Sequence, residues 1–213
     1  MHMKFDTILF DVDGTILNTC EGITKGVAYG IEKCGLPPLS FETRKRFIGP
    51  PLRESFMKYC GVSAQDAETV LKTYREYYSA KGMFECEPYD GIEELLQYMT
   101  DNGYTVYTAT AKPVEYTSVM LEKFDLKKYF KEIIGASMDK SMDTKEKIIK
   151  AVLDREKTAN AVMIGDTAYD VLGARENNVP TIAVTYGFGN REDLLNAKPD
   201  YIAETVEDIY KYI

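Results

Sequence analysis

The sequence predicts an α/β fold in which a parallel sheet core carries an inserted, all-helical domain. The apolar run at residues 7–10 has the length of a buried strand, and from about Asp90 onward strand and helix patterns alternate. This alternation is typical of a Rossmann-like core, a parallel sheet covered by helices on both faces. Residues 18–87 break the alternation, because they contain helical patterns and no convincing strand. The expected domains are therefore a sheet core of residues 1–17 and 88–213 and a helical domain of residues 18–87.

The segment from residue 18 to residue 87 has the pattern of successive helices separated by glycine and proline. Turns at residues 35–38 and 49–51 divide it, and further breaks are expected at Gly61 and Gly82. Between the breaks, apolar residues recur at helical spacing, as expected for helices that pack against one another. The apolar stripe of the first helix consists of Ile23, Val27, Ile31 and Cys34, and that of the last consists of Ala67, Val70, Leu71, Tyr74 and Tyr78.

Beyond this segment, short apolar runs alternate with amphipathic helices. Asp90 and Glu93 have the spacing of a capping box and predict the start of one helix, which Gly103 ends. Pro113 and Thr144 are suitable first residues for two further helices. The expected strands comprise residues 104–108, 133–135, 161–164 and 181–184, and Thr205 is expected to cap a last helix.

The composition argues for small molecules rather than nucleic acid as partners. The chain of 213 residues has a formal net charge of -8, so it has no surplus of Lys and Arg to neutralise a polymeric phosphate backbone. A small phosphorylated ligand needs only one or two local cations. We see no apolar run of membrane-spanning length and no signal peptide, so we expect a cytoplasmic protein without a membrane partner. The oligomeric state is left open.

Cysteine and histidine offer no zinc, redox or histidine-dependent site. The four cysteines form no C-x-x-C pair and have no histidine near them, so reduced thiols are expected. His2 is the only histidine and lies at the N-terminus, which argues against a histidine triad.

The pentapeptide Asp11-Val12-Asp13-Gly14-Thr15 is the most informative motif. It directly follows the strand at residues 7–10, and side chains two apart on a strand point the same way. Asp11 and Asp13 should therefore project together from the strand's C-terminal end, where open parallel sheets bind ligands. Two crowded carboxylates repel each other unless a cation or a shared proton relieves them, so one suits a metal-bound nucleophile and the other an acid–base group. A simple Asp–Gly turn is the alternative.

A hydroxyl and a lysine follow at later positions. Thr110 closes the region of the strand at residues 104–108, and its hydroxyl can donate to a phosphate oxygen. Lys145 lies at the start of a predicted helix, where a solvated lysine is the alternative. Lys112 and Lys147 compete with it for a cationic role.

A second pair of acids follows another buried strand. Asp166 and Asp170 come after the strand at residues 161–164 and would share one face if a helix begins at Asp166. The alternative is an N-cap and an ordinary first-turn acid. Mg²⁺ prefers oxygen ligands and is usually held by one or two carboxylates together with substrate phosphate. Acids at two strand ends, with a hydroxyl and a lysine, therefore predict a magnesium–phosphate site.

Taken in order, these motifs make the chain resemble the phosphatases of the haloacid dehalogenase superfamily. It is especially similar to phosphoglycolate phosphatase-like members with a small helical cap. The segments 48–52 and 185–189 also resemble those relatives. The motifs that carry the resemblance are Asp11-Val12-Asp13-Gly14-Thr15, Thr110, Lys145, and Gly165-Asp166 with Asp170.

The resemblance implies a magnesium-dependent phosphomonoester hydrolase that acts on a small, soluble phosphorylated metabolite. Asp11 would attack phosphorus and form an aspartyl-phosphate. Asp13 would protonate the leaving alkoxide and then activate the water that hydrolyses the intermediate. The helical insert would act as a cap that excludes water and selects substrates.

The resemblance also implies the ligands of the metal and of the phosphoryl group. Magnesium would be held by the Asp11 carboxylate, the Asp13 backbone carbonyl and Asp166, with Asp170 in or beside that shell. Thr110 and Lys145 would hold the phosphoryl oxygens. The further residues expected to bind substrate are Gly14, Thr15 and Ala111 in the core and Gly49 and Arg53 in the helical insert.

Two recognition modes are open for the part of the substrate beyond the phosphate. Proline fixes the backbone of Gly49-Pro50-Pro51, so this loop could present Arg53 or its own amides reproducibly. A cation there would favour a second negative charge, as in phosphoglycolate. An aromatic-lined cap that uses some of Tyr59, Tyr74 or Tyr77 would instead stack a nucleoside and give a 5'-nucleotidase.

More distant alternatives are a sugar phosphomutase, a dehalogenase and a non-catalytic phosphate-binding module. A mutase commonly uses a cap histidine, which this insert lacks, and a dehalogenase does not need Asp13. The chain also departs from residues that are common in the relatives: Asn18 replaces an aspartate, Ala111 an asparagine and Glu146 a proline. These departures bear on substrate preference more than on the reaction.

Overall fold

The computed structural model describes residues 4–137, 142–157 and 160–213. The chain divides into two compact units, one formed by Met1–Leu17 with Pro88–Ile213 and the other by Asn18–Glu87. We call the first the sheet unit and the second the helical unit.

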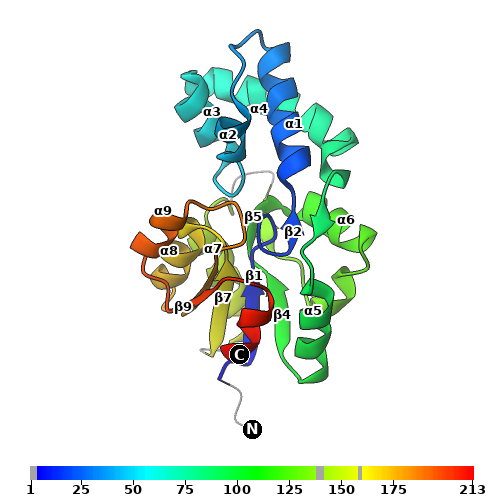
Figure 1. The fold of residues 1–213 in the computed structure, drawn as a ribbon, viewed down its shortest axis with the longest axis vertical. Helices are drawn as coiled ribbons and strands as arrows, with labels where there is room; N and C mark the ends of the chain where they lie inside the picture. The colour runs from blue at the N-terminus through cyan, green and yellow to red at the C-terminus, as the bar shows by residue number, and fades with distance from the viewer. Residues whose placement is uncertain (1–3, 138–141, 158–159) are drawn as a thin grey trace. The chain divides into compact units, whose positions relative to one another are not determined.

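A five-stranded parallel sheet forms the centre of the sheet unit (Figure 1). Its strand order is β4-β1-β7-β8-β9, and every adjacent pair runs parallel. In β1, Phe10 pairs with Thr108 on one side and with Ile164 on the other. The five strands are β1 Thr7–Phe10, β4 Thr105–Thr108, β7 Ala161–Gly165, β8 Thr181–Val184 and β9 Tyr201–Ala203.

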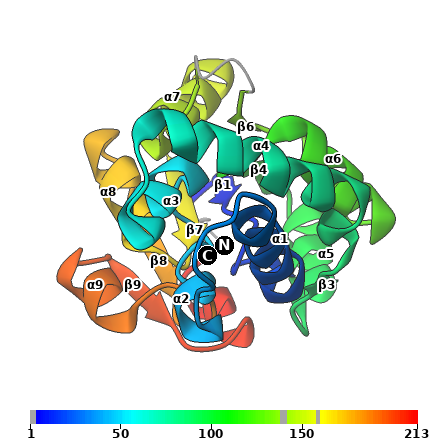
Figure 2. The ribbon, with the colours of Figure 1, turned by 90° about the horizontal axis from the view of Figure 1, so that it is seen from above.

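The strands are short apolar runs because helices cover both faces of the sheet. All residues of β1, β7 and β8 are buried. Helices α7 and α8 lie over one face and α5 over the other, as the two views in Figures 1 and 2 show. Ile149 of α7 belongs to the same buried cluster as Leu9 of β1 and Met163 of β7. The helices of this unit are α5 Ile92–Asp101, α6 Val114–Lys123, α7 Lys145–Glu156, α8 Ala168–Glu176 and α9 Arg191–Asn196.

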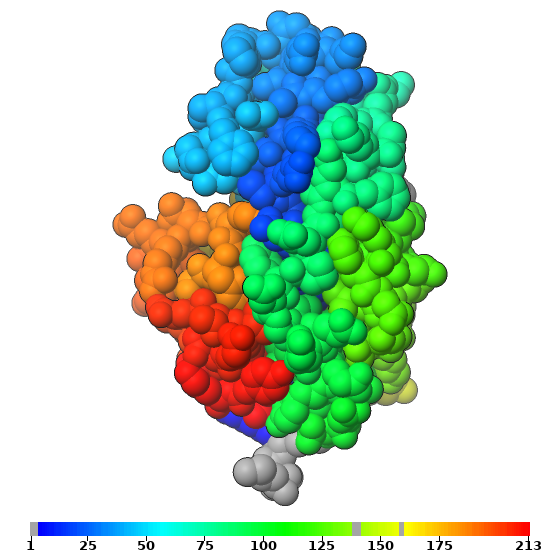
Figure 3. Space-filling model, turned by 45° about the vertical axis from the view of Figure 1, so that its right-hand side comes forward, coloured from blue at the N-terminus to red at the C-terminus, as the bar shows by residue number. Residues whose placement is uncertain are grey.

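Shorter elements complete the sheet unit. The C-terminal segment lies beside α5 (Figure 3), where the rings of Tyr98 and Tyr210 pack edge to face with centroids 5.0 Å apart. Strand β5 runs parallel to β6, and the two-residue strands β2 and β3 pair with each other. These elements are β2 Leu17–Asn18, β3 Glu87–Pro88, β5 Thr110–Pro113, β6 Gly135–Ala136 and the 3-10 segments η2 Lys127–Tyr129 and η3 Glu207–Lys211.

The helical unit is built on the packing of its first and last long helices. A Cβ atom on Gly26 would lie 2.7 Å from the ring of Tyr74, so the backbone of one helix approaches the aromatic ring of the other. Tyr74 is only 3% exposed and stacks on Tyr78 at a centroid distance of 5.2 Å. Its ring therefore belongs to the interior of this unit. The helices are α1 Cys20–Lys33, α2 Phe41–Lys45, α3 Leu52–Cys60 and α4 Ala64–Ala80, followed by the 3-10 segment η1 Gly82–Phe84.

The predicted fold class, a parallel sheet core with inserted helices, is confirmed, while some local boundaries differ. Gly91 rather than Asp90 precedes α5, with φ +82°, because glycine adopts this left-handed conformation at little steric cost. The strand expected at residues 133–135 is Gly135–Ala136, and the last helix is a 3-10 turn. Across the described ranges, the helices are too short or too polar to span a bilayer.

Candidate active site

Strands β1 and β7 are neighbours, and between them the strand order of the sheet reverses. The next strand of the sheet after β1 is β4, on one side, whereas the next after β7 is β8, on the other. Open parallel sheets bind ligands in the crevice at such a switch point. Asp11 directly follows β1, and its backbone N–H donates to the Ile164 carbonyl of β7 at 2.9 Å. Asp166 directly follows β7, so the two acids stand at neighbouring strand ends.

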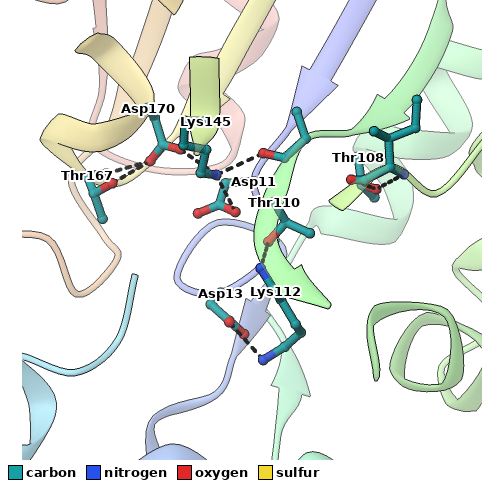
Figure 4. Close-up of polar contacts among 10 residues, drawn as sticks. Asp11, Asp13, Thr108, Thr110, Lys112, Lys145, Thr167 and Asp170 are labelled. Atoms are coloured by element: carbon teal, nitrogen blue, oxygen red, sulfur yellow. Dashed lines mark hydrogen bonds and ion pairs between the residues drawn. The ribbon is translucent and has the colours of Figure 1, made fainter. Parts of the chain in front are cut away.

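A buried lysine joins two of the acids (Figure 4). Lys145, the first residue of α7, places its Nζ 2.7 Å from Asp11 Oδ1 and 2.6 Å from Asp170 Oδ1. It also donates to the Ala109 carbonyl just beyond β4, at 2.8 Å. The lysine side chain is 5% exposed, and the two carboxylates are less exposed still. Three oxygens thus surround one ammonium group, which has three N–H donors.

Asp166 is held by the loop that follows β8. Its Oδ2 accepts hydrogen bonds from the backbone N–H groups of Phe188, at 2.7 Å, and Gly189, at 3.2 Å. A Cβ atom on Gly187 would come 2.4 Å from this oxygen and one on Gly14 2.2 Å, so both close approaches require glycine. Asp166 Oδ1 is buried and has no hydrogen-bond partner among the described residues. The protein therefore fixes one carboxylate oxygen of Asp166 by hydrogen bonds, and none from the described residues reaches the other.

The turn between β7 and α8 orients Asp170. Thr167 donates to Asp170 Oδ2 from its backbone N–H, at 3.0 Å, and from its hydroxyl, at 2.7 Å. Oδ1 of Asp170 then meets Lys145 (Figure 4). Gly165 allows the carboxylate to lie directly over the strand end, because a Cβ there would be 2.3 Å from Asp170 Cγ.

Three buried acids share this site with one lysine. One carboxylate oxygen from each of Asp11, Asp166 and Asp170 lies within 4.8 Å of the others. Burial, and then the charges of Asp11 and Asp170, raise the pKa of Asp166 well above its usual value. Burial also raises the pKa of Asp170, against the effect of Lys145. Burial opposes the charge of Lys145, but Asp11 and Asp170 outweigh it and raise the lysine pKa. A further cation at this cluster would relieve the repulsion.

Asp13 meets a second lysine rather than the acid cluster (Figure 4). Lys112 Nζ lies 2.8 Å from Asp13 Oδ2, and the two side chains are 5% and 11% exposed. Lys112 lies in β5 with Thr110, whose Oγ1 accepts from the Lys112 backbone N–H at 3.2 Å. Because a hydroxyl both accepts and donates, Thr110 Oγ can still donate to a phosphate oxygen.

The remaining predicted substrate residues are divided between the two units. In the sheet unit, Gly14 has φ +82°, Thr15 is fully buried and Ala111 is half-buried in β5. Gly49 and Arg53 belong to the helical unit. Arg53 Nε lies 2.7 Å from Glu68 Oε1, and the arginine side chain is 40% exposed. The positive charge of Arg53 therefore already has a partner within its own unit.

Sequence reasoning missed several groups that shape this site. The sequence offers Lys112 only as a competitor for the role of Lys145, whereas in the structure it pairs with Asp13. Phe188 and Gly189 contribute backbone N–H groups, which no side-chain pattern indicates. The signal that could have pointed to them is the glycine spacing of the Tyr186-Gly187-Phe188-Gly189 segment. Glycines that permit close backbone approach are typical of loops that contact a functional group.

Comparisons with known proteins agree with this geometry. The family described as haloacid dehalogenase-like hydrolase matches residues 8–184. A 5'-nucleotidase from Pseudomonas aeruginosa is 36% identical over 93% of this chain and 91% of its own length. Phosphoglycolate phosphatase 1 from the same organism is 24% identical over 95% of this chain and 77% of its own length.

A solved structure has the same fold over nearly the whole length of both chains. A crystal structure from Clostridium acetobutylicum, described as that of a predicted phosphatase, superimposes with a TM-score of 0.93 at 42% identity and covers 97% of each chain. The family match spans most of the chain and includes the strand ends that carry Asp11 and Asp166. The chain therefore belongs to the haloacid dehalogenase-like hydrolase family, and within it to the phosphatases.

Proposed function

We propose that this protein is a magnesium-dependent phosphomonoesterase that works through an aspartyl-phosphate on Asp11. The observation that carries the proposal is the buried cluster of Asp11, Asp166, Asp170 and Lys145 at the switch point of the sheet. Phosphoryl transfer depends on positioning and on neutralising charge more than on elaborate covalent chemistry. A lysine and a cluster of oxygen ligands supply both.

The donor set fits magnesium. Asp11 and Asp166 offer buried carboxylate oxygens, and Asp166 Oδ1 has no hydrogen-bond partner in the described part of the chain. Both oxygens of Asp170 already have partners, Oδ1 with Lys145 and Oδ2 with Thr167, which suits a supporting role beside the ion. These are hard oxygen donors of the kind that magnesium takes from proteins. Bound there, Mg²⁺ would neutralise part of the charge of the substrate phosphate.

The chain's own residues divide the remaining work. Asp11, held at a strand end by Lys145, is the nucleophile that forms a bond to phosphorus while the bond to the leaving oxygen breaks. Asp13, which pairs with Lys112 of β5, gives a proton to the leaving alkoxide and then takes one from the attacking water. The Thr110 hydroxyl donates to a phosphoryl oxygen, and Lys145 holds the phosphoryl oxygens through its positive charge.

A phosphate-release assay with defined variants tests this proposal. The wild-type protein should hydrolyse small phosphomonoesters, and Asp11→Asn should reduce turnover by several orders of magnitude, because an amide cannot replace a carboxylate nucleophile. Asp143→Asn is a matched control, since Asp143 is about half exposed and pairs with Lys147. Equal turnover by Asp11→Asn and the control would end the proposal.

Nucleoside 5'-monophosphates are a second substrate class for the same reaction, beside phosphoglycolate-like acids. The more similar of the two relatives from Pseudomonas aeruginosa is the 5'-nucleotidase. The ion pair of Arg53 with Glu68 also reduces the charge that Arg53 could offer to a second acidic group. Tyr74, however, is buried inside the helical unit and stacks on Tyr78, so its ring is not available to stack on a nucleoside.

Catalytic efficiency separates the two substrate classes. Phosphoglycolate and nucleoside 5'-monophosphates are compared in wild type and in Arg53→Ala. A preference for phosphoglycolate that Arg53→Ala removes would assign Arg53 to charge recognition. A preference for nucleotides that the substitution leaves unchanged would assign the protein to the 5'-nucleotidases.

A further inference from the structure

Tyr186 links the loop that holds Asp166 to the loop that carries Asp11. Its hydroxyl donates to the backbone carbonyl of Thr15 at 2.9 Å. Thr15 is the last residue of the motif that starts at Asp11. Two residues beyond Tyr186, the loop turns its backbone N–H groups, starting with Phe188, toward Asp166. One short segment therefore contacts both loops that supply acids to the site.

Packing fixes the ring of Tyr186. The rings of Tyr186 and Tyr89 meet edge to face with centroids 4.9 Å apart, and the Tyr89 backbone N–H donates to the Ile16 carbonyl at 3.1 Å. The consecutive carbonyls of Thr15 and Ile16 are thus each held by a tyrosine residue, one through its hydroxyl and one through its backbone. Burial, and then the nearby charge of Asp166, raise the pKa of the Tyr186 hydroxyl far above its usual value, so it remains a hydrogen-bond donor.

We propose that Tyr186 is a positioning residue whose hydroxyl fixes the Asp11–Thr15 loop relative to Asp166 and so sets the spacing of the oxygens that take the metal. The inference rests on the proposed magnesium-dependent function. If the hydrogen bond is lost, the loop that contains Asp11 can shift while Asp166 stays bound to Phe188 and Gly189. Metal affinity depends on such outer contacts, and their loss typically costs about 10- to 100-fold in affinity or activity.

Tyr186→Phe removes only the hydroxyl, and Tyr212→Phe is its matched control. Tyr212 also donates to a backbone carbonyl at 2.9 Å, that of Ile202 in the edge strand β9. For each protein, the melting temperature is followed during a titration with MgCl₂ in the absence of substrate, and kcat is measured at saturating Mg²⁺. The first readout reports metal binding without turnover.

We expect Tyr186→Phe to need about tenfold more Mg²⁺ for half of the thermal shift and to lose about tenfold in kcat. Tyr212→Phe should match wild type in both. If Tyr186→Phe lowers the metal-free melting temperature but binds Mg²⁺ like wild type, Tyr186 has only a structural role and the inference is wrong. If the wild type releases phosphate but shows no magnesium-dependent shift, the metal site fails and the inference fails with it. Absence of phosphatase activity in a wild type that binds Mg²⁺ would contradict the proposed reaction alone.

Discussion

Lys112 places its ammonium nitrogen 2.8 Å from Asp13 Oδ2, in the same way that Lys145 meets Asp11 at 2.7 Å. The two acids of the motif therefore have separate lysine partners. Each lysine is only 5% exposed, so water cannot readily replace it. This separation suits two acids that do different work, one as nucleophile and the other as acid–base group.

Replacement of Lys112 should impair catalysis even though the residue lies outside the acid cluster. Lys112→Met leaves Asp13 without its buried partner, and we expect kcat to fall by about 100-fold, the low end of the range of an acid–base contribution, because Asp13 itself is retained. Lys147→Met should stay within about twofold of wild type, because Lys147 is 53% exposed and pairs with Asp143 at the surface. Steady-state kinetics on one phosphomonoester checks both. Equal rates for the two variants would contradict a role for Lys112.

Replacement of Lys145 should harm both stability and turnover. Lys145→Met leaves Asp11 and Asp170 buried without their cation, and breaking such a buried pair costs about 3–5 kcal/mol. Urea unfolding in the presence of a chelator measures this loss, with Lys147→Met as control. Turnover should fall further than in Lys112→Met, because Lys145 also binds the phosphoryl group. A Lys145→Met protein as stable as the control would show that the lysine is not needed to compensate the acids.

Metal removal should abolish activity and lower stability together. Excess chelator should stop phosphate release, Mg²⁺ should restore it, and Ca²⁺ should restore it poorly, because its larger and looser shell misplaces the phosphate. Mg²⁺ should also raise the melting temperature, since Asp11, Asp166 and Asp170 repel one another within 4.8 Å. Asp166→Asn should lose most of this thermal shift. Full activity in excess chelator would refute the metal requirement.

The acids at the strand ends could be predicted because neighbouring residues in the sequence determine their positions. A buried strand followed by Asp11-Val12-Asp13-Gly14-Thr15 sets both the end of β1 and the direction of the side chains. Lys112 was not distinguishable, because its partner depends on the course of β5, where the register with β6 is irregular. The support of Asp166 by Phe188 and Gly189 comes from backbone groups, which every residue type except proline shares.

The ends of the helices were less predictable than their existence, because the ends also depend on the course of the backbone. Asp90 has a favourable capping side chain, yet Gly91 takes the position before α5 because the backbone there has φ +82°. The helical stripe of α4 was clear from Ala67, Val70 and Leu71, all of which are buried. The partner of Arg53, in contrast, depends on how α3 packs on α4, which the pattern of either helix does not specify.

Glu85 should contribute to the stability of the helical unit in a pH-dependent way. Its carboxylate accepts hydrogen bonds from Lys25, at 3.0 Å, and from Tyr77, at 2.8 Å. Burial acts to raise the pKa of Glu85, but these two hydrogen bonds outweigh it and lower the pKa. The contribution to stability is therefore present above the ordinary glutamate pKa and is lost as the pH falls through the lowered folded-state pKa.

Unfolding of Glu85→Gln at two pH values checks this contribution. At pH 7 we expect the variant to lose about 1.5–3 kcal/mol of unfolding free energy, the range for hydrogen bonds to a charged group. At pH 3 the difference from wild type should shrink. Glu42→Gln is the control, because Glu42 is 74% exposed and pairs with Lys45 in the same short helix. A deficit that is the same at both pH values would show that the charge of Glu85 is not responsible.

The central claim is that phosphate passes through Asp11. Wild-type protein is mixed with a small phosphomonoester and Mg²⁺, quenched in acid within the first turnover, digested and sequenced by mass spectrometry. Asp11→Asn treated in the same way is the control. The account predicts a labile acyl-phosphate on the peptide that contains Asp11 in the wild type and none in the variant. Phosphate on any other residue would contradict it. Hydrolysis without a phosphorylated peptide at any time in the first turnover would contradict it as well.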